Sequence, residues 1–171
     1  MYVGEPLGIK KHIMKEVFNV RCPYCCGNVK LVSASVVYHS NKYGNSKVWV
    51  CEHYPKCDAY VGCHPGTEIP LGRLANAKLR ALKVEAHKQF DPIWKSGLMT
   101  RKEAYKWLAD MLHIEEAECH IGKFSPDMCE KVIKICRRQD NIEIQEYRSK
   151  HYGYEQNRPV FTRGYKNRKK R

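Results

Sequence analysis

The spacing of apolar residues changes along the chain from a strand-like to a helical pattern. Val29–Tyr38 is rich in β-branched and aromatic residues, which is typical of a strand. Asn41–Ser46 has the composition of a turn, and Lys47–Cys51 then alternates its valines with other residues as a returning strand does. Asp58–Cys63 is a candidate third strand. The pattern predicts a small β-hairpin domain over residues 21–66.

Residues 67–138 carry the spacing of amphipathic helices. Asn76 suits the N-cap of a first helix, which Asp91-Pro92 is expected to stop or re-cap, and Gly97 is expected to end a short turn. The apolar stripe of this helix recurs every three or four residues at Leu79, Leu82, Ala86 and Phe90.

A second helix is the most clearly marked element. Thr100-Arg101-Lys102-Glu103 has the pattern of a capping box. The apolar face that follows it consists of Ala104, Trp107, Leu108, Met111 and Leu112. Glu115–Ile121 predicts a further turn or two, closed by Gly122, and Ser125-Pro126 predicts the start of a last helix. The buried face of that helix is expected to hold Cys129 or Met128, then Val132, Ile133 and Cys136.

Both ends of the chain lack strong periodicity. Residues 1–20 have one weakly helical apolar face, and residues 139–171 interleave tyrosines with Lys and Arg before the basic run Lys166–Arg171. We interpret residues 139–171 as a flexible basic, aromatic arm. The sequence therefore predicts an α+β protein with an N-terminal segment (1–20), a β-hairpin domain (21–66), a small helical domain (67–138) and this arm.

Charge narrows the expected partners. The 171 residues include 31 Lys and Arg against 18 Asp and Glu, a formal net charge of +13. Such a balance favours polyanions, most often nucleic acid. No apolar run approaches the ~20 residues needed to cross a bilayer, and residues 1–20 have no apolar stretch typical of a secretory signal. We expect a cytoplasmic protein without a membrane partner.

Two cysteine pairs give the most specific chemical signal. Cys22 and Cys25 are followed, after a hairpin's length of chain, by Cys51 and Cys57. In a reducing compartment, closely spaced thiols are more often metal ligands than disulfides, and two such pairs indicate a tetrahedral zinc site. A catalytic zinc keeps one coordination position open, whereas four thiolates leave none. We therefore predict one structural Zn²⁺ in a zinc ribbon.

Neighbouring residues leave the ligand set partly open. Cys26 follows Cys25 directly and is an alternative ligand, whereas Cys63 and His64 fit a neighbouring or core role better than ligation. No catalytic motif accompanies the site: there is no Gly-rich phosphate loop, no G-x-S-x-G, no H-E-x-x-H and no deaminase His-x-Glu before C-P-Y-C. We predict that the protein is not an enzyme.

The ribbon segment resembles a known class of zinc ribbon. C-P-Y-C from Cys22, followed by V-W-V-C-E-H-Y-P-K-C from Val48, is similar to the ribbons at the C-terminal end of type IA DNA topoisomerases. Those ribbons bind single-stranded DNA and are not catalytic, so the resemblance implies the same here. This chain departs from them in carrying Cys26 where glycine usually stands, in having only one ribbon, and in lacking a counterpart of the catalytic tyrosine domain.

A longer resemblance covers residues 20–137. Its motifs are C-E-H-Y-P-K-C-D-A-Y-V-G-C-H from Cys51, P-L-G-R-L-A-N-A from Pro70, D-P-I-W-K-S-G from Asp91, R-K-E-A-Y-K-W-L-A from Arg101 and C-H-I-G from Cys119. Together they resemble a family of zinc-finger-containing proteins of phages and bacterial mobile elements. The resemblance implies a phage or prophage origin, and hence a bacterial host cytoplasm, but no established function.

Aromatic and basic residues are candidates for nucleic-acid contacts, because rings stack on bases and cations follow phosphates. The candidates are Lys42, Tyr43, Lys47, Trp49, Lys56, Arg80, Lys83, Arg163, Lys166, Arg168, Lys169, Lys170 and Arg171. Packing over the zinc site is an alternative role for Trp49 and the favoured role for Tyr54. A solvated helix face is the alternative for Arg80 and Lys83.

Two other functions stay open. Glu103–His120 has the rhythm of a helix-turn-helix, but Glu115, Glu116 and Glu118 would repel phosphates, so plain core packing is the simpler interpretation. Alternatively, a phage-type protein of this kind could bind and modulate or inhibit a host protein such as RNA polymerase, a nuclease or a defence complex. Nucleic-acid binding that weakens with salt would favour the nucleic-acid role. Capture of one protein that tolerates salt would favour binding to a host protein.

Overall fold

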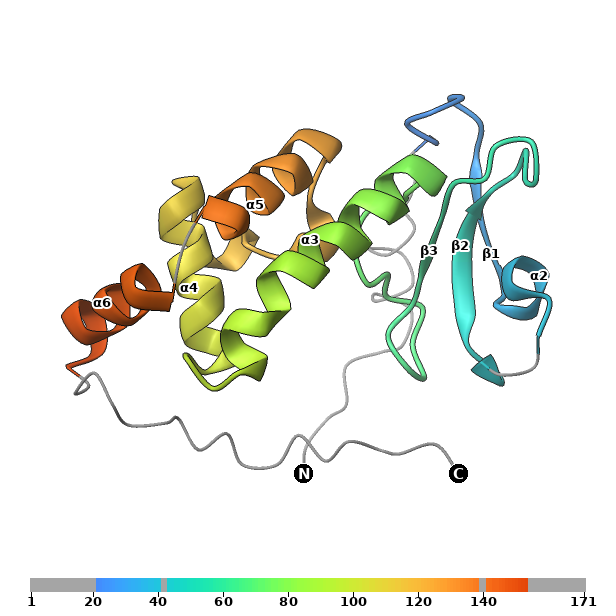
Figure 1. The fold of residues 1–171 in the computed structure, drawn as a ribbon. Coiled ribbons are helices and arrows are strands. Elements are labelled where there is room, and N and C mark those ends of the chain that lie inside the picture. The colour runs from blue at the N-terminus through green and yellow to red at the C-terminus, as the bar shows by residue number, and fades with distance from the viewer. Residues whose placement is uncertain (1–20, 41–42, 139–140, 154–171) are drawn as a thin grey trace, which may run out of the picture. The chain divides into compact units, whose positions relative to one another are not determined.

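The computed structural model describes residues 21–40, 43–138 and 141–153 (Figure 1). The chain forms two compact units that divide between Arg80 and Ala81. A three-stranded antiparallel sheet is followed by helices, which confirms the predicted α+β class. The expectations for residues 1–20, for Lys42 and for residues 154–171 lie outside the described residues.

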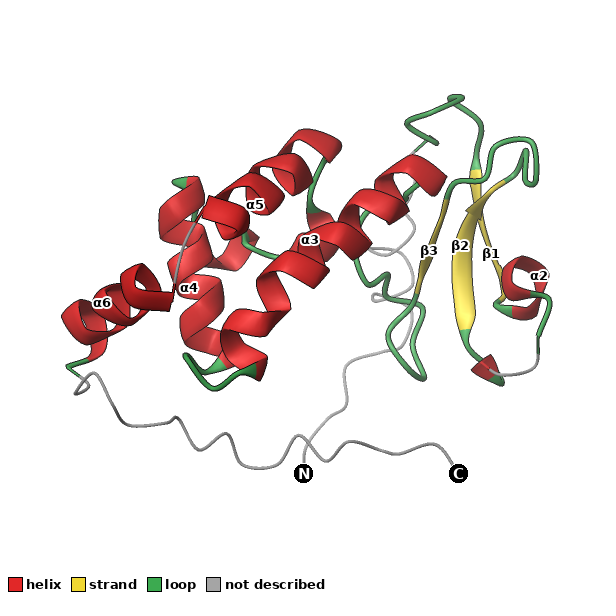
Figure 2. Ribbon diagram, in the orientation of Figure 1, coloured by secondary structure: helices red, strands yellow, loops and turns green. Residues whose placement is uncertain are grey.

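The sheet has the order β1-β2-β3 and consists of β1 (Val29–Ser33), β2 (Lys47–Cys51) and β3 (Tyr60–Gly62), drawn in yellow in Figure 2. Val29 lies opposite Cys51 in the β1–β2 pair, so the hairpin register brings the two ends that carry cysteines together. The predicted alternation in β2 is confirmed, because its two valines are buried while Lys47 is exposed.

The predicted first strand ends earlier than expected. After Ser33 the chain forms α2 (Ser35–Tyr38), a single helical turn. The Ser33 hydroxyl accepts the Ser35 N–H at 3.3 Å, a local bond that competes with continued strand pairing. Val37 is then buried in a cluster with Ala34 and the two valines of β2. The predicted strand is therefore wrong beyond Ser33, although the segment as far as Tyr38 is rich in β-branched residues.

A loop covers the outer edge of β3. Tyr60 and Ala75 exchange two backbone bonds of 3.0 and 3.1 Å, and the Leu71 N–H donates to the Gly62 carbonyl at 2.8 Å. Cys63 and Pro70 form an isolated bridge in the same stretch. These bonds satisfy edge groups that would otherwise be free to pair with another chain.

The first long helix is α3 (Ala77–Lys95). As predicted, the Asn76 side chain caps it by accepting the Leu79 N–H at 2.9 Å. Three of the four expected stripe residues are buried: Leu79, Ala86 and Phe90. The predicted stop at Asp91-Pro92 is wrong, since the helix runs four residues beyond Asp91.

Local contacts allow α3 to continue through Pro92. Proline cannot donate the helical bond of its own N–H, but the Ser96 N–H donates to the Pro92 carbonyl at 2.9 Å, so hydrogen bonding continues after the proline. The Asp91 carboxylate pairs with His87 at 3.1 Å and with Lys95 at 2.6 Å, one turn to either side. These pairs brace the turn that contains the proline.

The second helix is α4 (Arg101–Leu112), and its capping box is confirmed. The Thr100 hydroxyl accepts the Glu103 N–H at 3.2 Å, and the Glu103 carboxylate accepts the Thr100 N–H at 2.7 Å. Two single 3₁₀ turns follow, η2 (Glu116–Glu118) and η3 (Ile121–Lys123). No α-helix lies between α4 and residue 126 of the described chain, so the helix-turn-helix interpretation is wrong.

The last predicted helix is α5 (Pro126–Arg138), which contacts α4. The Ser125 hydroxyl accepts the Met128 N–H at 3.3 Å, as expected of an N-cap. Cys129, Val132 and Ile133 form its buried face. Gly122 does not close the preceding turn but lies inside η3.

The helical part extends further than the sequence indicated. α6 (Asn141–Tyr152) lies in the part of the chain for which the sequence predicts a flexible arm, so this prediction is wrong for residues 141–152. Ile144 and Arg148, one turn apart, are both buried, and the Tyr147 hydroxyl bonds to the Asp110 carboxylate of α4. Because one of the buried positions of α6 is an arginine, a search for apolar periodicity does not detect this face. None of the described helices is long and apolar enough to cross a membrane.

Candidate metal centre

Two tight turns present the four predicted ligands. In the first turn, residues 22–27, the Cys22 N–H donates to the Gly27 carbonyl and the Cys26 N–H to the Cys22 carbonyl, both at 2.8 Å. In the second, residues 51–57, the Tyr54 N–H donates to the Cys51 carbonyl at 3.0 Å. Each turn is closed by its own backbone bonds and sits at an end of the β1–β2 ladder, which sets the cysteines facing one another.

The sulfur geometry fits one zinc ion. The Sγ atoms of Cys22, Cys25, Cys51 and Cys57 all lie within 4.8 Å of one another. Two of the separations are 3.6 Å, between Cys22 and Cys57, and 3.3 Å, between Cys25 and Cys51. A tetrahedron with Zn–S bonds of ~2.3 Å has sulfurs about 3.8 Å apart. Four thiolates at this spacing make a closed, structural zinc site.

The site has a buried side and an exposed side. Cys22 and Cys51 are 1% and 0% exposed and pack with Ala59, Val29 and Leu74, whereas Cys25 is exposed. The domain is too small to bury a large hydrophobic core, so zinc binding supplies part of its folding stability.

Backbone donors face three of the four sulfurs. The Gly27 N–H, together with the His53 imidazole, lowers the pKa of the Cys25 thiol to about 6. Burial raises the pKa of Cys51 to about 12, against the opposing N–H of His53. Burial also raises the pKa of Cys57, although a backbone N–H two residues later lowers it. Each donor follows its cysteine by two residues and is placed to stabilise a metal-bound thiolate.

Two residues that the sequence did not single out join the cysteine turns. The Glu52 carboxylate accepts the Asn28 backbone N–H at 2.6 Å and its side-chain amide at 3.2 Å, and the Glu52 N–H donates to the Asn28 carbonyl. These hydrogen bonds lower the pKa of Glu52. Next to them, the His53 Nδ1 lies 3.4 Å from the Cys25 sulfur. A Cβ on Gly27 would lie 2.8 Å from this imidazole, so glycine leaves room for His53 in this position.

The alternative ligands lie outside the cluster. Among the described residues, the group of close metal-binding atoms comprises the four cysteines and not Cys26, Cys63 or His64. Cys26 is exposed, with a φ of 58°. Cys63 is buried at the bridge to Pro70, and burial raises the pKa of its thiol. None of the nine cysteines, all within the described ranges, forms a disulfide.

Arg80, a predicted nucleic-acid contact, has a structural role that the sequence did not indicate. Its guanidinium donates to the carbonyls of Asp58 and Ala75 at 2.7 and 2.6 Å and pairs with the Asp58 carboxylate at 2.8 Å. The guanidinium carbon also lies 4.0 Å from the centre of the Tyr60 ring. The same carboxylate accepts the Ala77 N–H at 2.8 Å, so Arg80 and Asp58 tie the start of α3 to the ribbon.

Three other predicted contacts are also engaged within the protein. The Lys83 ammonium donates to the Gly122 carbonyl at 2.7 Å. Lys47 pairs with Glu68 at 2.7 Å, and the half-buried Trp49 donates its indole N–H to the Glu68 carbonyl at 2.8 Å. Both bonds hold the loop that contains Glu68 against β2.

Tyr43 and Lys56 are exposed on the ribbon. Tyr54 packs against the cluster of Ala34, Val37 and the two β2 valines and not against the buried cysteines, so its expected place over the zinc site is wrong. The remaining candidates lie outside the described residues: Lys42, Arg163, Lys166, Arg168, Lys169, Lys170 and Arg171.

The ribbon carries a group of three tyrosines in contact, which we call the tyrosine cluster: Tyr38, Tyr43 and Tyr60. The rings of Tyr38 and Tyr43 have centroids 4.4 Å apart, and those of Tyr38 and Tyr60 are 5.7 Å apart in an edge-to-face pair. Tyr38 and Tyr43 are 37% and 44% exposed, although aromatic rings of this size usually hide more of their surface. The Arg80 guanidinium lies over the Tyr60 ring of this cluster.

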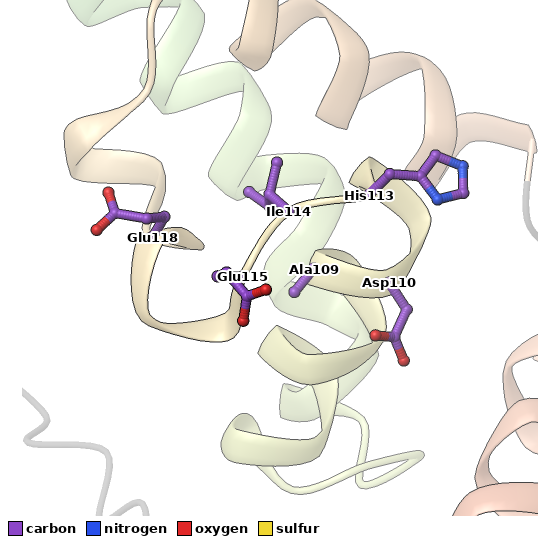
Figure 3. A pocket seen from close by; sticks show the side chains of 6 residues that line it. All are labelled: Ala109, Asp110, His113, Ile114, Glu115 and Glu118. Atoms are coloured by element: carbon purple, nitrogen blue, oxygen red, sulfur yellow. The ribbon is translucent and has the colours of Figure 1, made fainter.

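The helical unit contains a hollow of a different character. It has a volume of about 690 Å³ and is lined by Ala109, Asp110, His113, Ile114, Glu115 and Glu118. Figure 3 shows that its three carboxylates do not converge on one point. The hollow is thus an acidic surface in a basic chain rather than a second metal centre.

The sheet, the two cysteine turns and the four sulfurs define a zinc-ribbon protein with one structural zinc ion. The model of the zinc-finger-containing domain family DUF3268 matches residues 18–139, and the chain belongs to that family. The matched range contains all four ligands and continues through α5, but it ends before α6. No curated protein and no solved structure matches the chain.

Proposed function

We propose that this chain is a zinc-dependent nucleic-acid-binding protein whose ribbon takes single-stranded or non-specific DNA or RNA, and that it acts as an accessory protein of a phage or mobile element. The ribbon's likeness to those of type IA topoisomerases and the longer likeness to phage proteins support the two halves of this proposal.

The tyrosine cluster is the observation that carries the proposal. Tyr38 and Tyr43 expose ring surface side by side, and Tyr38 is held in turn by Tyr60, so they need little ordering when a base stacks on them. Base–aromatic stacks contribute ~1–3 kcal/mol each and tolerate any base, because every base has a π-face. A binding site of this kind selects unpaired bases rather than a sequence.

Positive charge complements these rings. The net charge of +13 attracts phosphates over the whole molecule, and Lys56, exposed in the second cysteine turn, forms no ion pair within the described residues. Lys47, Arg80 and Lys83 are occupied by internal bonds, so we assign the ribbon's affinity chiefly to the tyrosine cluster and Lys56.

The zinc ion acts on binding through the fold. The turn at residues 43–45 and the cysteine turns lie at opposite ends of one short hairpin. Zinc supplies roughly 10–16 kcal/mol to such small domains, so its removal should dissolve the cluster as well as the metal site.

The test compares Tyr43→Ala with Tyr43→Phe, using fluorescence anisotropy of a labelled single-stranded oligothymidine at low salt. Alanine removes the ring and should weaken binding by about 5-fold or more, whereas phenylalanine keeps it and should bind like the wild type. Equal affinity of all three proteins, or no binding by any of them, would refute the ribbon surface.

One observation favours a second function, namely binding to a host protein. The acidic hollow beside α4 would repel phosphates but would accept a basic protein surface. If the tagged protein captures one stoichiometric host protein from a lysate after nuclease treatment and at high salt, this function is supported. If it captures only nucleic acid that is lost at high salt, the first function is supported.

A further inference from the structure

The helical unit carries a second row of alternating cations and rings, separate from the tyrosine cluster. We call it the Trp94 row, and its members are Lys95, Trp94, Arg101, Tyr105 and His120. The Lys95 ammonium lies 5.2 Å from the centre of the Trp94 ring. The Arg101 guanidinium carbon lies 5.8 Å from the Trp94 ring centre and 5.1 Å from that of Tyr105. Tyr105 and His120 are stacked at 6.0 Å with an interplanar angle of 22°.

Two helices and the N-cap residue of η3, His120, supply these residues, and packing fixes the row in place. Trp94 and Lys95 end α3, Arg101 begins α4 and Tyr105 follows one turn later. Behind the row, the buried Phe90 meets Tyr105 edge to face at 4.8 Å. The rings of Trp94 and Tyr105 are half-buried, while Lys95, Arg101 and His120 are exposed. The row is therefore a supported surface and not a set of loose side chains.

The positive charge of Arg101 does not stabilise the helix in which it lies. Lys95 is neutralised by Asp91, but no ion pair among the described residues involves Arg101. Arg101 and Lys102 occupy the first turn of α4, where the helix dipole disfavours cations and an acid would stabilise more. An exposed guanidinium held against two aromatic rings suits a ligand that brings both negative charge and flat surface.

We propose that the Trp94 row is a second binding site for single-stranded nucleic acid, at which an unpaired base stacks on Trp94 while Arg101 contacts the phosphate. Duplexes hide the faces of their bases, so the single strand is the form this surface takes. The inference rests on the proposed function, because it assigns the same class of ligand to a second place on the chain.

The test compares two neighbouring cations in the zinc-loaded full chain. Arg101→Ala and Lys102→Ala each remove one charge from the same turn of α4, but only Arg101 lies against the rings. With a labelled oligothymidine at low salt, Arg101→Ala should weaken binding about 5- to 20-fold and Lys102→Ala about 2-fold. Arg101→Lys should fall between them, since it keeps the charge and loses the flat guanidinium. Thermal unfolding of each variant checks that the fold is kept.

The outcomes separate this inference from the proposed function. If Arg101→Ala binds as Lys102→Ala does while Tyr43→Ala is weakened, the ribbon binds nucleic acid and the Trp94 row is not a site. If Arg101→Ala binds the oligonucleotide more weakly and Tyr43→Ala does not, the Trp94 row is a binding site and the ribbon surface is not. If the wild-type protein binds no oligonucleotide, both are wrong. A duplex of equal length bound as tightly, with the same loss in Arg101→Ala, would overturn recognition of unpaired bases.

Discussion

Cys25 and Cys26 are adjacent and both exposed, but they differ in backbone conformation and in role. Cys25 points its sulfur into the metal cluster, whereas Cys26 has a φ of 58°, in the left-handed region that favours glycine. Glycine would adopt this backbone conformation at a lower cost than cysteine does. The thiol of Cys26 contributes nothing to the ligand set.

We predict opposite effects for substitutions at these two positions. Cys26→Gly should retain one zinc ion per chain and raise stability by about 1 kcal/mol, because glycine relieves the cost of a left-handed residue. Cys25→Ala should lose the metal and unfold the ribbon. Zinc content by metal analysis, together with thermal unfolding, measures both effects. Loss of zinc from Cys26→Gly would mean that the ligand set is wrong.

A second residue-scale prediction concerns Arg80. Its three hydrogen bonds and its contact with Tyr60 belong to the protein's own structure. We expect Arg80→Ala to lower the free energy of unfolding by about 2 kcal/mol, because it leaves the Asp58 carboxylate without its main partner. Arg80→Lys should recover only part of this loss, since an ammonium cannot reproduce the fork. Denaturant unfolding that shows no change in Arg80→Ala would contradict this role.

The sequence could predict the ligands but not the residues that join them. Zinc ligands occur in short, local spacings, which are visible in the sequence. By contrast, Asn28 and Glu52 are 24 residues apart, and Arg80 and Asp58 are 22 apart. Such partners meet only once strand register and loop path are fixed, and no local pattern encodes them.

Among the elements, those with strong local signals lie where they were expected. The capping box places α4, and Asn76 and Ser125 place the starts of α3 and α5. The misplaced elements are governed by tertiary packing: α2 forms because Val37 is buried, and α6 buries an arginine on its inner face. Propensity and periodicity carry no information about these contacts.

The capping box gives an element-scale prediction. Thr100→Ala should reduce stability by about 1 kcal/mol, because the Glu103 N–H loses its acceptor at the start of α4. Thr100→Ser is the matched control, since serine keeps the hydroxyl and should cost little. Chemical denaturation of the two variants measures the difference. Equal stability of the alanine and serine variants would show that the cap does not stabilise the helix.

On the scale of the whole molecule, the family range and the basic C-terminal segment are distinct. The family model ends at residue 139, and α6 follows it. The sequence from Arg158 to Arg171 contains seven Lys and Arg and no acid. A useful truncation therefore ends at Gly153, because a cut at Arg148 would pass through α6 and remove its later turns.

We expect truncation after Gly153 to weaken binding to single-stranded nucleic acid and to make it less sensitive to salt. Each phosphate contact that is lost should reduce the slope of log K against log salt by about 0.7. Anisotropy titrations at several salt concentrations measure both quantities. As a control, a chain that keeps residues 154–171 with its Lys and Arg changed to Gln separates charge from length. An unchanged affinity and slope would exclude a role for this segment.

The most direct test of the account is the salt-dependent affinity of the full chain for a single-stranded oligonucleotide, measured with zinc bound and after the metal is removed by a chelator under reducing conditions. We predict binding at low salt that falls linearly in log K with log salt, a loss of at least about 10-fold on removing zinc, and recovery when zinc is restored. Equal binding with and without zinc, or no binding at low salt, would contradict the claim that zinc holds a nucleic-acid-binding surface.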